Sequence, residues 1–305
     1  ENAHGIDIES YTAAVSRMDE KTETIIDKVG TTKIGYKGYQ FKGAHAPQKE
    51  GTNTWGGRSI LGNTTTDNEI TLNGNYDDVY GGWTSGTGST ATGTDAKNHS
   101  KGNKITLEGA TSQVHNMNGG FTDAAGGNAS DNHAILNAGE VNGNLIGGSA
   151  EHGDATKNTV EIKDGTVGNS TYGGSAGGTG KAEENTVTLT SGTAGGDIFG
   201  GLASSGDATK NTVNINGGSV GSHNVYGAWT TSGNATHNTV TIKGNGGTVQ
   251  EIIGGRSQSG NATHNTVNLG DGTAPFTTGI TGTISGGSGM GSGDYLTGNT
   301  LNVHG

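Results

Sequence analysis

The chain has 305 residues, of which 61 are glycine, while hydrophobic residues make up 28% and charged residues 15%. This shortage of large core-filling side chains excludes a thick multilayer core and argues against a deep dinucleotide-binding α/β enzyme. The net charge of −11, with only three arginines, argues against nucleic-acid binding. The sequence has no run of about 18 apolar residues that could span a bilayer.

The first 50 residues differ from the remainder of the chain. Between Ile8 and Val29 the apolar residues recur at helical spacing and Gly30 follows, which predicts an amphipathic helix over about 9–29. Tyr36, Tyr39 and their apolar neighbours then predict a strand or hairpin. We expect residues 1–50 to cap the open end of the domain that follows.

Residues 51–305 carry a strong internal repeat. The sequence Asn-Thr-Val-x-Ile/Leu starts at Asn158, Asn185, Asn211, Asn238 and Asn265, with spacings of 27, 26, 27 and 27 residues. An apolar pair followed by Gly-Gly recurs in step with it, as does Gly-x-Ala before the asparagine. Three marks that share one period indicate a repeat architecture.

Each repeat reads as three short strands separated by glycine corners. In Asn158–Ile162 apolar and polar residues alternate, so Val160 and Ile162 would face inward and Thr159 and Glu161 outward. The unit is too rich in glycine and β-branched residues for a helical repeat. The sequence therefore predicts an all-β, right-handed parallel β-helix (β-solenoid) of about nine coils, with a length of ~43 Å.

In-register stacking turns equivalent residues into vertical columns. The repeat asparagine shares the inward parity of the valine, so it requires hydrogen-bond partners, and we expect a structural ladder of stacked amides. The column before it alternates in charge from Asp131 to Lys210 and ends in His237 and His264, which adjoin and could bind a metal. The predicted ladder comprises Asn132, Asn158, Asn185, Asn211, Asn238, Asn265 and Asn299.

Two further columns are candidate surfaces. The residue before each Gly-Gly is often aromatic, and such a column is either stacked inside the core or exposed as a recognition stripe. Outward threonine and asparagine residues of the Asn-Thr-Val strands form a flat array like that of ice-binding solenoids, although threonine is also an ordinary exposed strand residue. The candidate binding stripe comprises Trp55, Tyr80, Tyr172, Phe199 and Tyr226.

One coil is longer than the others. Between Gly82 and Asn103 the spacing is 21 residues instead of 10 to 12, which predicts a loop insertion at 83–102. Insertions on solenoids commonly build the binding face, whereas many are merely tolerated loops. The candidate binding-loop residues are Trp83, Thr84 and Asp95.

The sequence gives little support for catalysis. Glycan-cleaving β-helices need clustered carboxylates on one face, whereas the adjacent pairs Asp77/Asp78 and Glu183/Glu184 should point to opposite faces by strand alternation. No nucleophile elbow, HExxH helix or phosphate-binding loop is present. We therefore expect no enzymatic activity and no cofactor or resident metal.

The Val-Tyr-Gly-Gly and Gly-Asp-Ala-Thr-Lys-Asn-Thr-Val patterns resemble the passenger-domain repeats of bacterial autotransporter (type V secreted) adhesins, over residues 51–305. The resemblance implies a β-helix, export to the outside or outer surface of a Gram-negative cell, and binding to a protein or glycan of a host or neighbouring cell. A C-terminal translocator barrel and an integrin-type motif are absent from this sequence.

Three functions remain open at this point. The leading hypothesis is a non-catalytic adhesin or structural rod that binds through the stripe or loop. The first alternative is a filament subunit in which the open coil near 299–303 pairs with the N-terminal segment of the next molecule. The second alternative is a β-helix enzyme acting on polysaccharides.

Overall fold

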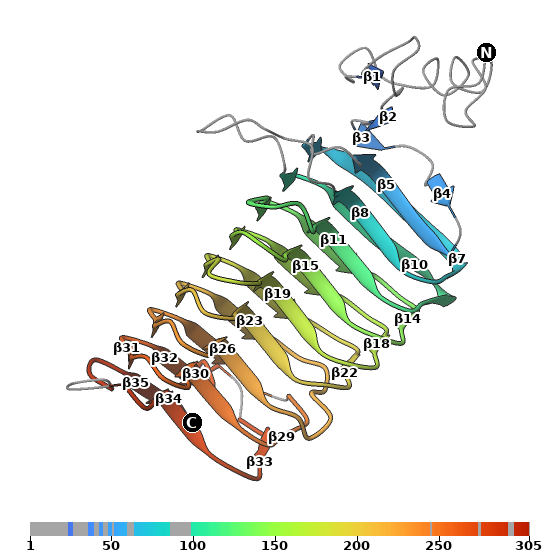
Figure 1. Ribbon diagram of the computed structural model, residues 1–305. Helices are drawn as coiled ribbons and strands as arrows, with labels where there is room; N and C mark the ends of the chain where they lie inside the picture. The colour runs from blue at the N-terminus through green and yellow to red at the C-terminus, as the bar shows by residue number, and fades with distance from the viewer. Residues whose placement is uncertain are drawn as a thin grey trace.

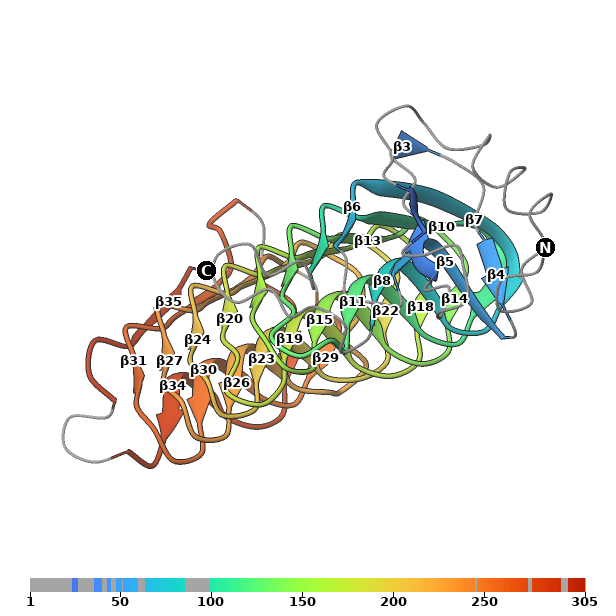
Figure 2. The same ribbon diagram turned by 45° about the horizontal axis from the view of Figure 1, so that its top comes forward.

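The computed structural model describes residues 24–26, 36–39, 43–44, 48–50, 52–59, 64–85, 99–244, 246–273, 276–291 and 296–304. Within these residues all regular structure is β, and the coils follow one another around a single axis (Figures 1 and 2). The protein is therefore a parallel β-solenoid, as the repeat predicted. One wall of the solenoid is a sheet that stacks nine parallel strands, and the chain makes about eight turns instead of the nine expected.

Three sheets form the walls of the solenoid, and we name each by its repeat sequence. The Gly-Gly sheet contains β5 (Asn53–Ser59), β8 (Val79–Thr84), β11 (Met117–Thr122), β15 (Leu145–Ala150), β19 (Thr171–Ala176), β23 (Ile198–Ala203), β26 (Val225–Thr230), β30 (Ile252–Ser257) and β34 (Ile284–Gly289). The Ala-Thr sheet contains β6 (Thr65–Thr66), β9 (Ser100–Lys101), β12 (Ala129–Ser130), β16 (Ala155–Thr156), β20 (Ala182–Glu183), β24 (Ala208–Thr209), β27 (Ala235–Thr236) and β31 (Ala262–Thr263).

The Asn-Thr-Val sheet contains β7 (Asn68–Tyr76), β10 (Lys104–Val114), β13 (His133–Leu136), β17 (Thr159–Ile162), β21 (Thr186–Leu189), β25 (Thr212–Ile215), β28 (Thr239–Ile242), β32 (Thr266–Leu269) and β35 (Thr300–Val303). The short strands β14 (Glu140–Val141), β18 (Thr166–Val167) and β22 (Thr193–Ala194) extend it through β10. Strands β29 (Thr248–Val249) and β33 (Gly279–Ile280) form a separate pair.

Four short strands precede the first coil. Strand β1 (Thr24–Ile26) pairs antiparallel with β2 (Tyr36–Tyr39), and β2 and β4 (Gln48–Glu50) pair antiparallel with β5. Strand β3 (Gly43–Ala44) pairs parallel with β7. The helix predicted over about 9–29 lies outside the described residues except at 24–26, where the chain is a strand.

The core is one narrow apolar column shared by all coils. In β17 the exposure alternates as predicted, with Val160 and Ile162 fully buried and Thr159 and Glu161 half-buried on the outside. Each inward residue lies directly over its equivalent in the next coil, as Val160 does over Val187. Because the same few aliphatic side chains repeat at every level, a chain poor in large hydrophobic residues still builds a continuous core.

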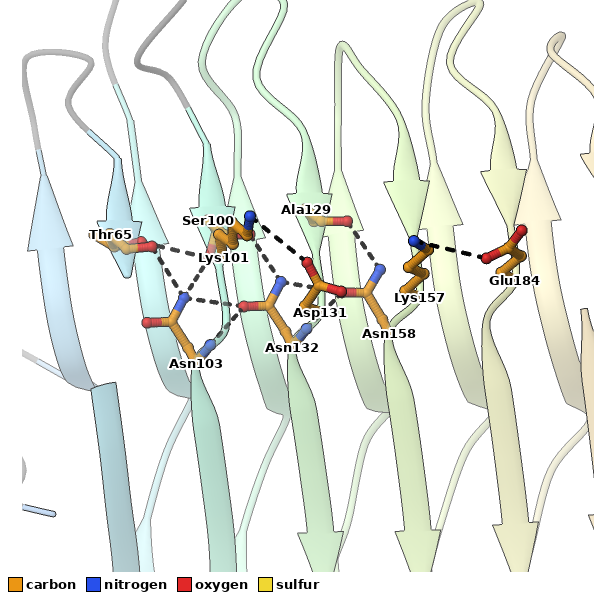
Figure 3. A network of polar contacts seen from close by, with 10 residues as sticks. All are labelled: Thr65, Ser100, Lys101, Asn103, Ala129, Asp131, Asn132, Lys157, Asn158 and Glu184. Carbon is orange, nitrogen blue, oxygen red and sulfur yellow. Dashed lines mark hydrogen bonds and ion pairs between the residues drawn. The ribbon is translucent and has the colours of Figure 1, made fainter. Parts of the chain in front are cut away.

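The asparagine column is a fully bonded ladder inside the solenoid (Figure 3). The Asn158 amide donates from Nδ2 to Oδ1 of Asn185 at 3.0 Å and to the Ala129 carbonyl at 2.9 Å. Its Oδ1 accepts from the backbone and side-chain nitrogens of Asn132 at 3.1 and 3.0 Å. The amide-to-amide bonds continue from Asn68 to Asn299. From Asn103 to Asn265 each ladder amide therefore has partners for both N–H groups and for its oxygen.

The glycine pairs are required by this ladder and by the stacking. A Cβ on the first glycine, as at Gly200, would meet the carbonyl oxygen of Gly227 in the next coil. A Cβ on the second, as at Gly201, would meet the side chain of Asn211. The first position is glycine in all nine strands, whereas Ala228 occupies the second position in β26 and is buried. The backbone contact is therefore stricter than the contact with the amide.

The residue before each ladder asparagine adopts a left-handed conformation. Lys157, Glu184 and Lys210 have φ values of 56°, 57° and 55°. Lys157 Nζ lies 3.9 Å from Glu184 Oε2, and Lys210 Nζ lies 3.3 Å from Glu184 Oε1, so these alternating charges do attract across coils. Lys210 also contacts Glu183 at 3.1 Å. The expectation that Glu183 and Glu184 point to opposite faces is wrong, because the positive φ at Glu184 breaks the strand alternation.

Candidate functional site: the aromatic face

The outer surface of the Gly-Gly sheet carries the candidate site. In each six-residue strand the first residue is on the core side, as Ile198 and Val225 are, while the second and fifth residues point outward. Strand β5 starts one residue earlier, and its Trp55 and Arg58 are equivalent to these second and fifth positions. The first glycine of the pair, the third residue, has no partner in the Cα pairing between neighbouring strands. The glycine pair therefore interrupts simple alternation, and one outward side chain lies on each side of it. We call this surface the aromatic face. Its residues are Trp55, Arg58, Tyr80, Trp83, Asn118, Phe121, Ile146, Ser149, Tyr172, Ser175, Phe199, Leu202, Tyr226, Trp229, Ile253, Arg256, Ser285 and Ser288.

The composition of the aromatic face differs from that of the whole chain. All three tryptophans of the protein lie on it, together with two of its three arginines, Arg58 and Arg256. None of its 18 positions is lysine, aspartate or glutamate. Enrichment in Trp, Tyr and Arg with depletion of Lys, Asp and Glu is the pattern of protein interfaces and their energetic hot spots.

An N-terminal cluster occupies strands β5, β8 and β11. The Arg58 guanidinium lies 4.9 Å from the Trp55 ring centroid and 4.6 Å from that of Trp83, at cation–π distance from both. Tyr80 packs against Trp83 with ring centroids 5.0 Å apart, and Phe121 lies 5.7 Å from Tyr80. Aromatic side chains from three successive coils therefore form one contiguous surface.

The charges beside this cluster are partly shielded from water. Burial raises the pKa of the Asp123 carboxyl, and the Trp83 indole and the positive charges of His152 and Arg58 only partly oppose that effect. Burial and the carboxylates of Asp78, Asp123 and Asp77 raise the pKa of Tyr80 to about 12. The Tyr80 hydroxyl therefore keeps its proton at neutral pH and can donate a hydrogen bond.

A C-terminal cluster occupies strands β19, β23, β26 and β30. Tyr172 and Phe199 stack at 5.1 Å with an interplanar angle of 5°, and Phe199 and Tyr226 stack at 5.2 Å with an angle of 15°. Trp229 lies edge-on to Tyr226 at 5.2 Å, and the Arg256 guanidinium lies 4.8 Å from the Trp229 centroid. The two clusters are thus built from the same residue types.

A carboxylate fixes the polar groups of this second cluster. Glu251 Oε2 accepts a hydrogen bond from the Tyr226 hydroxyl at 3.2 Å and lies 3.6 Å from Arg256 Nη1. Burial and the charge of Glu251 raise the pKa of Tyr226 to about 12. The arginine is held in place by an ion pair and an aromatic ring, which reduces the entropy it would lose on binding a partner.

The structure answers whether the aromatic column lies in the core or outside. The rings form a cluster separate from the aliphatic core, on the outer side of the sheet. They nevertheless shield one another, so that Tyr226 is 2% exposed and Phe199 6%, whereas Trp83 and Trp229 are half-buried. A binding partner would therefore meet mainly the fifth-position side chains.

The predicted binding loop needs a correction. Trp83 and Thr84 belong to strand β8, where Trp83 is on the aromatic face and Thr84 is fully buried. The residue after the glycine pair continues the strand, so the insertion starts later than 83. Asp95 lies outside the described residues. The fifth-position residues Arg58, Trp229 and Arg256 were missed, although Trp-Gly-Gly-Arg, Tyr-Gly-Ala-Trp and Ile-Gly-Gly-Arg mark them in the sequence.

Other candidate chemistry is limited in the described ranges. His237 and His264 stack at 5.0 Å, and the described residues contain no group of three or more His, Asp or Glu side chains that could hold a metal ion. Among those same residues, no helix has the length and apolar character needed to cross a membrane. Comparisons with family models, with curated proteins and with solved structures found no match to this chain. The class that the fold defines is therefore a parallel β-solenoid repeat protein.

Proposed function

We propose that this protein is a non-catalytic, adhesin-like rod that acts outside a Gram-negative cell and binds a host or neighbouring cell through the aromatic face. The carrying observation is the concentration of all three tryptophans and both described arginines on one face of a solenoid. The repeat resemblance to autotransporter passengers supports the location. The acidic net charge argues for a partner other than a nucleic acid.

The interior of the rod supports a mechanical role. The asparagine ladder and the in-register sheets bond every coil to the next through both side chains and backbone. Such a solenoid presents an elongated, stiff surface on which side chains from several coils act together. The inward side chains of these strands would therefore make the rod rigid, and the outward side chains would bind the partner.

Cell binding by purified protein tests the proposal. Trp83→Ala and Trp229→Ala each remove a half-buried ring from the aromatic face and should weaken binding to target cells at least tenfold. Thr188→Ala, on the outward side of β21, is the matched control and should leave binding unchanged. Equal binding by the tryptophan variants, with native circular dichroism, would remove the aromatic face from the function.

A second candidate function is end-to-end assembly into filaments. In strand β35 the inward-type residues Leu301 and Val303 are 46% and 66% exposed, and β35 pairs with β32 on one side only. An exposed apolar strand edge is a template for pairing with another chain. Fibres visible by negative-stain microscopy, and lost in Leu301→Lys, would support this candidate; single short rods at high concentration would contradict it.

A further inference from the structure

The fifth-position column of the aromatic face reads nearly the same in both directions. In-register pairing places its members one above another through eight coils of the Gly-Gly sheet. The order is Arg58, Trp83, Phe121, Ser149, Ser175, Leu202, Trp229, Arg256, and Ser288 of β34 follows as the ninth member. The centre of the first eight members lies between Ser149 and Ser175, and from there outward each half carries serine, a large apolar residue, tryptophan and arginine.

A symmetric order along a flat face matches the requirement of a two-fold dimer. In an isologous interface one surface contacts its own copy, so the surface must be self-complementary. If two rods pack face to face and antiparallel about this centre, Ser149 meets the second copy's residue 175 and Phe121 meets its residue 202. Trp83 then meets the second tryptophan, residue 229. Small residues lie opposite small ones and apolar residues opposite apolar ones.

The dimensions of the face suit a stable interface. Eight coils at ~4.8 Å and a six-residue strand at ~3.3 Å per residue give a surface of ~38 by ~20 Å. That corresponds to ~760 Å² on each partner, close to the ~800 Å² per partner of a standard specific interface. The strands of this sheet lie side by side without a break (Figure 1), so a second straight rod can follow the whole length.

The charges at the ends of the face fit the same arrangement. Arg58 begins the column and Arg256 is followed only by Ser288, so both arginines lie near its ends, where an interface has its solvated polar rim. Arg256 forms an ion pair with Glu251, with Nη1 and Oε2 3.6 Å apart. Arg58 attracts the Asp123 carboxylate, because the arginine charge acts to lower the pKa of that carboxyl. The two arginines that face each other in the antiparallel pair are therefore each accompanied by a carboxylate.

From these features we infer that the aromatic face binds a second copy of this chain, antiparallel and centred between Ser149 and Ser175. The inference rests on the proposed function, because it names the partner of the same face. Two cells that carry the protein would adhere when rods pointing in opposite directions pair along this surface.

Sedimentation velocity on the full chain tests the self-association. The wild-type protein should form dimers with increasing concentration, and Trp229→Asp should remain monomeric because it places an unpaired charge in the interface. Ser175→Glu changes the centre without removing a packed ring, so it should also abolish the dimer even if Trp229→Asp misfolds. Thr188→Asp, on the outer surface of the Asn-Thr-Val sheet, should dimerise like wild type. A wild-type monomer at high concentration, or dimers indifferent to Ser175→Glu, would overturn the inference.

Thiol crosslinking tests the register, and the chain has no native cysteine to interfere. A mixture of Phe121→Cys and Leu202→Cys proteins should crosslink with a short bis-maleimide. Neither protein alone should do so, because equivalent residues lie three coils, or ~14 Å, out of register. Efficient crosslinking within either single variant would exclude the antiparallel arrangement.

Cell binding distinguishes the failure of this inference from the failure of the proposed function. If Ser175→Glu abolishes binding to cells that lack the protein while the wild type sediments as a monomer, the face binds a different partner and only the inference fails. If wild-type dimers form but neither Ser175→Glu nor Trp229→Ala affects binding to any cell, the proposed function fails instead.

Discussion

The aromatic face and the outer surface of the Asn-Thr-Val sheet are two outer surfaces of the same coils. Both cover the same aliphatic core, yet one carries tryptophan, tyrosine and arginine and the other mainly threonine and asparagine, as in Thr186 and Asn214. The rings of the aromatic face form a cluster of their own, separate from the aliphatic core. The two surfaces therefore differ in composition although the coils beneath them are the same, which directs attention to the aromatic face.

The largest expected effect is a loss of stability when a buried ladder asparagine is changed, compared with the same change on the outer surface. Asn185→Asp removes a donor to Asn211 and Ala155 and places a charge in the buried ladder, so the free energy of unfolding should fall by about 3–5 kcal/mol. Asn214→Asp makes the same chemical change on the outer surface and should cost less than about 0.5 kcal/mol. Urea denaturation followed by circular dichroism measures both. Similar losses for the two variants would refute the buried role of the ladder.

The glycine pair beneath the aromatic face gives the next largest effect. Gly200→Ala brings a methyl group against the Gly227 carbonyl and should lower the free energy of unfolding by about 3 kcal/mol. Gly201→Ala should cost only about 1 kcal/mol, because β26 already accommodates Ala228 at that position. Thermal unfolding of both variants checks the order; the reverse order would show that the ladder is stricter than the backbone stacking.

Substitutions at the corner between the Ala-Thr and Asn-Thr-Val sheets should have a smaller effect on the free energy of unfolding. Lys157 has a φ of 56°, so the β-branched Lys157→Val should lower the free energy of unfolding by about 1–2 kcal/mol. Lys157→Gly should stay within about 0.5 kcal/mol of wild type, since glycine accepts this conformation. The same urea assay applies, and a valine variant as stable as the glycine variant would contradict the strained corner.

The smallest effect concerns the pH dependence at the aromatic face. The native state holds the Asp123 proton more tightly than the unfolded chain, where the pKa is near 3.8. This stabilisation is complete below the unfolded-state pKa and is lost as pH rises through the higher native pKa. Asp123→Asn should therefore raise the melting temperature at pH 7 relative to wild type and show less gain at pH 3. A larger gain in melting temperature at pH 3 than at pH 7 would contradict a raised Asp123 pKa in the native state.

Much of the fold could be predicted from the sequence because the solenoid repeats its constraints. The spacing of Asn158, Asn185 and Asn211 gave the period, and the alternation around Val160 gave the inward side. Local exceptions could not be predicted in the same way. Glycine marks this positive-φ corner only at Gly102 and Gly298, whereas polar or charged residues such as Glu184 occupy it in the other coils, so strand alternation alone gives the wrong direction for the Glu184 side chain.

The site was only partly predictable for a related reason. Tyr172, Phe199 and Tyr226 were identified as a column, but alternation could not place them because the glycine pair interrupts it. The same interruption hid the fifth-position residues Trp229 and Arg256, which lie outward beside them. Stacking contacts between side chains of different coils become visible only in three dimensions.

Protection of single thiols in the bound state tests the central claim, binding through the aromatic face, most directly. Ser149→Cys places a thiol on the aromatic face and Thr188→Cys places one on the Asn-Thr-Val sheet, in a chain with no other cysteine. With protein bound to target cells, the maleimide labelling rate at position 149 should fall at least tenfold while that at position 188 stays unchanged. Equal rates at position 149 in the free and bound protein, or protection only at position 188, would contradict the account.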